Sequence, residues 1–292
     1  MRDGSALATL RRQPWHPAEQ MRRQLGRSVR QMFNDPGRGE APVIPSADAL
    51  FAPDTPIRMV HADVTSMMVG GVAALLLQML HPHALQGVLD HSDFRHDLDR
   101  RLRRTARFVA VTTYGPAADA ARAIERVNAI HRHINGTLPD GTPYSATDPA
   151  TLAWVHLAEA WSFLNAYVTL VRPDMPGGEQ DEYYRQFAVL ARLLGAAPVP
   201  ESRAQAAELM AAMRPALSAG PAPRQVAQVV LNHRGSTISA MAQPVLTQAA
   251  VDLLPPFART MLGLRSSPLP AISTRLATRM LGGTIRWALR PA

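Results

Sequence analysis

Two ionisable side chains lie on an otherwise apolar face of the helix predicted for the segment WVHLAEAWSFL. His156 and Glu159 are three residues apart, so they lie about one turn apart on the same face. The rest of that face is apolar and includes Leu152 and Phe163. Burial of both polar groups is tolerable if they satisfy each other, or if together they hold a polar ligand or a metal. From the sequence alone, His156 and Glu159 could form either a structural pair or a binding site.

A further histidine is predicted to face the interior from the helix expected over residues 117–135. Ile124, Val127 and His131 follow helical spacing and form one stripe, whereas His133 lies toward the polar side. An inward histidine is either a hydrogen-bonded core residue or a ligand. The spacing alone does not choose between them.

Arginines line one face of the preceding helix, in the segment RRLRRTARFVAVTTYG. Arg101, Arg104 and Thr105 share a face by the three- and four-residue rule. Thr105 also belongs to the apolar stripe of that helix, so the group lies on the border between surface and core. An arginine on such a border can reach a buried carboxylate or a cofactor propionate, while a solvated face is the alternative.

Three more histidines lie in LHPHALQGVLDHSDF, namely His81, His83 and His91. Proline after His81 is typical of the first turn of a new helix, and Ser92 or Asp93 is predicted to cap the arginine helix. His81 is the member of this group that we retain as a candidate ligand.

Helical periodicity dominates the chain, and runs of β-branched alternation are nearly absent. The fold class is therefore predicted to be all-α, with one large helical domain over residues 56–292 and a peripheral N-terminal helix and Pro-rich connector over residues 1–55. Thr147 or Asp148 is expected to cap the helix that begins at Pro149. The predicted helices span 64–80, a shorter one from Pro82, 94–113, 117–135, 149–171, 178–195, 203–218, 223–231, 251–264 and 272–289.

Composition excludes several kinds of site. The chain of 292 residues has no cysteine, which rules out disulfides, thiolate zinc sites, iron–sulfur clusters and a thiolate haem ligand. A metal would have to use nitrogen or oxygen ligands. The net charge is +8, but arginine is spread over the chain without the aromatic interleaving of a single-strand binder, so we predict no nucleic-acid partner.

Membrane signals are weak. The N-terminal residues lack the apolar core of a signal peptide, which predicts a cytoplasmic protein. Residues 64–80 are uncharged but contain adjacent glycines and no interfacial aromatic anchors, which favours a helix buried in protein. The basic amphipathic helix near the C-terminus, expected to break at Gly282–Gly283, is predicted to pack on the main body, with peripheral membrane contact as the alternative.

The order and spacing of these segments resemble a known family. Between Met59 and Gly195 the chain is similar to the oxygenase family of MpaB and latex-clearing protein, the rubber oxygenase. The resemblance rests on the segments LLLQMLHPHALQGVLDHSDFRHDLDRRLRRTARFV, VNAIHRHINGTLPDGTPYSATDPATLAWVHLAEAWSFLNAY and YYRQFAVLARLLG.

The resemblance implies a b-type haem in a buried pocket between the central helices, with a histidine as the iron ligand. His131 lies nearest the expected position, with His156 and His81 as reserves. His156 and Glu159 would then support the ligand or line the haem pocket.

The resemblance also implies distal-pocket residues. The R-x-x-K-T pattern of the rubber enzyme matches Arg101, Arg104 and Thr105, so an arginine stands where that enzyme has lysine. Arginine keeps its proton and is a poor iron ligand. The resting state in which a lysine caps the iron is therefore not expected in this protein. The glutamate base of the rubber enzyme has no match between His81 and His91.

The function expected from the resemblance is that of a haem-dependent oxygenase, an oxidoreductase that uses dioxygen to oxidise a lipophilic small molecule. The alternatives are a non-catalytic protein that binds or senses haem or a lipophile, and a helical protein without metal. The oligomeric state is left open.

Overall fold

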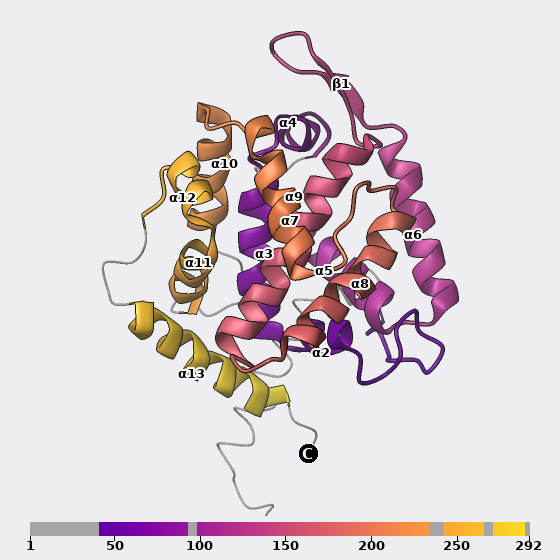
Figure 1. The fold of residues 1–292 in the computed structure, drawn as a ribbon, viewed down its shortest axis with the longest axis vertical. Coiled ribbons are helices and arrows are strands. Elements are labelled where there is room, and N and C mark those ends of the chain that lie inside the picture. The colour runs from indigo at the N-terminus through magenta and orange to yellow at the C-terminus, as the bar shows by residue number, and fades with distance from the viewer. Residues whose placement is uncertain (1–40, 93–97, 234–241, 266–270, 290–292) are drawn as a thin grey trace, which may run out of the picture.

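The all-α prediction is confirmed. A computed structural model describes residues 41–92, 98–233, 242–265 and 271–289, and most of these residues lie in helices (Figure 1). The helices are α2 (Pro56–Ala62), α3 (Val64–Gln78), α4 (Pro82–His91), α5 (Leu98–Tyr114), α6 (Ala117–His131), α7 (Pro149–Leu170), α8 (Gly177–Leu193), α9 (Arg203–Met213), α10 (Pro221–Asn232), α11 (Ala242–Leu253), α12 (Pro256–Leu262) and α13 (Ala271–Leu289), with a 3-10 turn, η2 (Arg214–Ala216).

Helices α3 and α7 form the centre of the molecule and run antiparallel. Gly70 of α3 lies so close to α7 that an added Cβ would stand 3.0 Å from the Phe163 backbone. At the other end of the pair, the Trp154 indole donates to the Leu77 carbonyl over 3.1 Å. The close approach is possible because Gly70 has no side chain, and it sets the register in which the two helices meet.

The remaining helices surround this pair. In Figure 1, α10, α11 and α12 lie on one side of it, and α5, α6 and α8 lie on the other. α13 packs against α3, α7 and α11, while α2 contacts α5 and α8. One large hydrophobic core joins these layers, and its fully buried side chains include Trp154, Tyr183, Leu76, Leu77 and Leu157.

Local signals explain where α7 begins and what precedes it. Asp148 caps the helix by accepting from the Thr151 amide over 2.7 Å, with proline at the next position, as predicted. The turn-rich connection before it contains a short hairpin that the sequence did not reveal, β1 (Asn135–Thr137) paired with β2 (Pro143–Ser145). Gly141 has a φ of 87° in its turn, a conformation that favours glycine.

Several helix assignments needed correction, and the expected helices over 117–135 and 203–218 end earlier, at His131 and Met213. The expected helix over 251–264 is wrong, because α11 ends at Leu253 and the adjacent prolines 255 and 256 begin α12. The short helix α2 was missed. The break expected at Gly282–Gly283 does not occur, since α13 continues through both glycines. Helix-favouring neighbours and packing against the body offset the glycine penalty of about 1 kcal/mol each.

The segment before α2 is tied to the corner between α5 and α6. Ser46 donates its amide to the Tyr114 carbonyl over 2.8 Å, and Ala117 donates to Asp48 over 2.6 Å. Phe51 is buried. Residues 1–40 of the predicted peripheral region, and Asp93 as a possible cap, lie outside the described residues.

No single helix of the described segments is long and apolar enough to cross a membrane. The bent pair α2 and α3 together meets that criterion by length and composition only. In the fold, α3 is largely enclosed by other helices, in line with the interpretation of residues 64–80 as a buried helix.

A buried histidine links three helices near this core. His61 of α2 makes hydrogen bonds to the Thr113 hydroxyl over 2.9 Å and to the Tyr183 hydroxyl over 3.3 Å. Its ring also meets Phe163 and Phe187 edge-on. Burial lowers the pKa of His61 to about 3.

This shift makes stability depend on pH. The pKa of His61 is lower folded than unfolded, so its contribution is complete above pH 6.5 and is lost as the pH falls toward 3. Between pH 7.5 and 5.5, the titration of His61 alone should reduce the free energy of unfolding by about 1.4 kcal/mol. Urea denaturation at pH 7.5 and 5.5 measures the loss. In His61→Gln the loss should be smaller by that amount, while the titration of His81 is common to both proteins. If both proteins lose the same free energy of unfolding between the two pH values, His61 is not the source of this pH dependence.

Candidate functional site

Polar side chains from four helices lie near one another around the middle of α7. We call Gln78 (α3), Arg101 (α5), His131 (α6), His156 and Glu159 (both α7) the central polar cluster. The members are connected through Glu159 and His156, by the contacts and electrostatic interactions described next. The cluster brings together four of the seven site residues expected from sequence, together with one that was not expected.

The α7 pair forms the middle of the cluster. His156 Nδ1 lies 3.5 Å from Glu159 Oε2, within ion-pair distance. Gln78 Nε2 donates to Glu159 Oε1 over 3.1 Å and to the Val155 carbonyl over 3.4 Å. Glu159 is therefore held by a neighbour on each side. His156 Nδ1 is buried and has no hydrogen bond within the described residues, so this ring retains capacity for a further polar partner.

Arg101 approaches the same carboxylate from α5. Burial lowers the pKa of its guanidinium, the charge of Glu159 raises it, and that of Arg104 lowers it. The arginine remains protonated because its ordinary pKa is so high. Arg104 and Thr105 lie on the same helix and are exposed. The predicted trio is thus divided: Arg101 is partly buried and lies within electrostatic range of Glu159, whereas the other two are open to solvent.

His131 is the last residue of α6 and is half-buried, whereas His133 is exposed. Its Nδ1 atom is buried and has no hydrogen bond within the described part of the chain. Burial lowers the pKa of His131, and the neighbouring His156 lowers it further. Both effects favour the neutral imidazole at pH 7, which is the form that can give a lone pair to a metal.

His81 belongs to a different group. It stands at the N-terminus of α4, where its ring meets His83 edge-on at 5.3 Å between centroids. Burial lowers the pKa of His81 to about 4, His83 lowers it further, and Asp148 opposes the change. The side chains that act on His81 are therefore His83 and the Asp148 cap of α7, and neither belongs to the central polar cluster.

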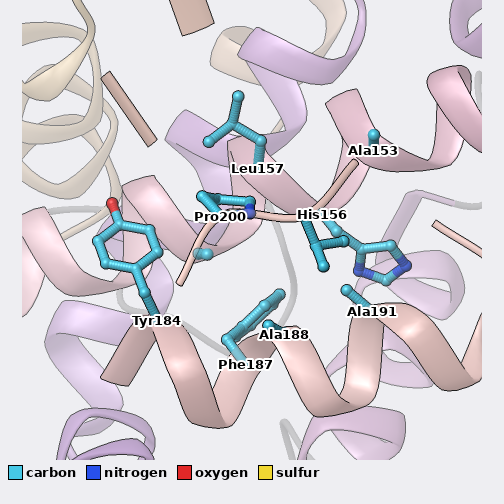
Figure 2. Close-up of a pocket in the computed structure, with 10 residues that line it drawn as sticks. Ala153, His156, Leu157, Tyr184, Phe187, Ala188, Ala191 and Pro200 are labelled. Atoms are coloured by element: carbon cyan, nitrogen blue, oxygen red, sulfur yellow. The ribbon is translucent and has the colours of Figure 1, made fainter. Parts of the chain in front are cut away.

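A small apolar pocket lies on the other side of His156, between α7 and α8. Figure 2 shows Phe187 and Ala188 of α8 across from His156 and Leu157 of α7, with Pro200 over the space. The cavity volume is only about 10 Å³. That is about the space of a single water molecule and far below the roughly 300–1,000 Å³ of ligand pockets, so this pocket is not a ligand site as it stands.

Within the described segments, no three His, Asp or Glu side chains are arranged to hold a metal ion by themselves.

Gln78 is the member of the cluster that sequence reasoning missed. It is the last residue of a long apolar helix, and a polar side chain at that position was a signal that could have found it.

Comparison with known families gives the class of the protein. Residues 58–287 match the family model described as ER-bound oxygenase mpaB/B'/Rubber oxygenase, catalytic domain. The chain therefore belongs to this oxygenase family, and the match extends beyond the resemblance at 59–195 to include the C-terminal helices. No match was found to a curated protein or to a solved structure.

Proposed function

We propose that the protein binds a b-type haem through His131 and uses dioxygen to oxidise a lipophilic small molecule. Membership of an oxygenase catalytic family supports the reaction class. The observation that carries the cofactor proposal is the imidazole of His131, whose Nδ1 is buried without a hydrogen-bond partner in the described residues and which lies within electrostatic range of His156.

The donor set fits a haem better than a bare ion. A haem iron needs only one or two protein ligands because the macrocycle supplies the others, and histidine is a common one. The chain has no cysteine to offer in its place. A neutral, half-buried histidine with a polar group beside it meets this requirement, whereas a bare ion would need the three-residue cluster that the described residues lack.

The chain's own residues would orient and shield the cofactor. Ligating histidines usually rely on a polar neighbour that fixes the ring, and the His156–Glu159 pair beside His131 is suited to that role. Gln78 keeps the Glu159 carboxylate in place. When bound, haem supplies the dioxygen chemistry, and the protein supplies orientation and a dry pocket.

The arginine helix would meet the negative or polar ends of the ligands. The partly buried Arg101 lies within electrostatic range of Glu159, and its guanidinium could also bind an anion such as a haem propionate. Arg104 and Thr105, exposed on the same helix, would contact substrate or a propionate from the open side. Because arginine does not ligate iron, Arg104 would take no part in holding the haem iron.

An absorption spectrum tests the cofactor, and oxygen uptake tests the reaction. We expect freshly purified or haem-reconstituted protein to show a Soret band that saturates at one haem for each chain. Addition of lipophilic alkenes should then start steady oxygen consumption. A Soret band without oxygen uptake across a panel of alkenes would favour the non-catalytic haem or lipophile carrier. Absence of a saturable band after reconstitution would overturn the haem proposal.

A further inference from the structure

The C-terminal helix presents two different faces. α13 crosses the edge of the molecule, drawn in yellow at the lower left of Figure 1. Its inner face is docked on the body: Thr278 is fully buried, and a Cβ on Gly282 would lie 3.4 Å from the Thr65 hydroxyl. Arg286 Nη1 bonds to Asp63 Oδ2 over 2.8 Å. These contacts fix which side of the helix faces outward.

The outer face is apolar and uncovered within the described structure. Leu276, Met280 and Trp287 are 57%, 67% and 39% exposed. Their spacing of four and seven residues places them in one line along the helix. We call them the α13 stripe. Large side chains aligned in this way are unusual on a surface and indicate an interaction site.

The charge beside the stripe indicates the kind of partner. Residues 271–289 contain Arg275, Arg279 and Arg286 and no acidic residue. By helical phase, all three arginines lie about a quarter turn from the stripe, on the same flank. Arg279 donates to the neutral Thr169 carbonyl and so keeps its full charge. An apolar line with cations along one edge matches an anionic lipid surface, where acyl chains lie beneath phosphate groups.

Other occupants fit this charge less well. A second copy of the helix would bring like charges together, which opposes association. Residues 1–40 also carry more arginine than acidic residues, so they would repel the same edge. We therefore propose that α13 lies on anionic lipid bilayers, with Leu276, Met280 and Trp287 in the acyl boundary and Arg275 and Arg279 at the phosphates, while Arg286 stays paired with Asp63. The proposal does not depend on haem or on turnover.

Vesicle sedimentation of the full chain tests the proposal. We expect binding to vesicles of phosphatidylcholine with phosphatidylglycerol, little binding to phosphatidylcholine alone, and weakening by salt. Met280→Glu with Trp287→Glu should reduce the partition coefficient at least about tenfold, because the buried apolar area is lost and like charges are added. Val189→Glu is the matched control, since Val189 on α8 is 45% exposed and lies outside the stripe.

Each other outcome overturns the proposal. Binding that persists in the double variant would place the lipid contact elsewhere, for example on the basic N-terminal region. Equal binding to neutral vesicles would remove the role of the arginines. A dimer that the double variant dissolves, without vesicle binding, would identify a second copy as the occupant. Circular dichroism confirms that both variants remain folded, and glutamate keeps good helix propensity at these positions.

Discussion

His131→Ala is expected to abolish haem binding while leaving the apoprotein folded. If this imidazole is the iron ligand, its loss should lower haem affinity by more than the roughly 10–100-fold that follows loss of an outer-shell partner. The Soret band of purified protein should disappear, and oxygen uptake with it. Because alanine has high helix propensity and His131 is the last residue of α6, the melting temperature of the apoprotein should change little.

His133→Ala is the matched control for this experiment. It removes a second imidazole two residues away, but His133 is exposed and lies on the polar side. Its Soret band and haem stoichiometry should equal those of the unmodified protein. A band that survives in His131→Ala and is lost in His156→Ala would transfer the ligand role to α7. Loss in His81→Ala alone would transfer it to α4.

Trp154→Ala is expected to produce the largest loss of stability among core substitutions considered for α7. Trp154 is fully buried between the central helices and donates to the Leu77 carbonyl. Truncation leaves a large cavity and removes that hydrogen bond, so the free energy of unfolding should fall by about 3–5 kcal/mol. Urea denaturation at pH 7.5 measures the change.

Trp161→Ala on the same helix gives the comparison. Trp161 is only partly buried at the edge of the core, so its truncation should cost clearly less than that of Trp154. Equal losses would show that the α3–α7 contact is not the principal anchor of the fold. If the Trp154→Ala protein that remains folded still binds haem, then Trp154 contributes to core packing and not to the haem site.

Local features of the site could be predicted because they depend on one helix at a time. The phase of α6 placed His131 inward and His133 outward, and the structure has these same orientations. The spacing of His156 and Glu159 predicted their approach, now seen at 3.5 Å. The cap at Asp148 followed from residue types next to a proline. Each rests on the fixed geometry of an α-helix.

Contacts between helices could not be predicted in this way. Nothing in the periodicity of α5 indicated that Arg101, rather than Arg104, would reach Glu159. Nor did it show that Gln78 would hold that carboxylate. The hairpin at 135–145 was also missed, since each strand is only three residues long.

Residue types and spacing were enough to establish that the fold is all-α, that thiolates take no part in the chemistry, and which faces of α6 and α7 turn inward. Which of those inward groups lie together depends on how the helices pack. The physical reason is that helical phase follows from residue spacing, whereas the register between helices follows from packing over the whole core. The close approach at Gly70 aligns α3 with α7, and that alignment brings Gln78 to Glu159.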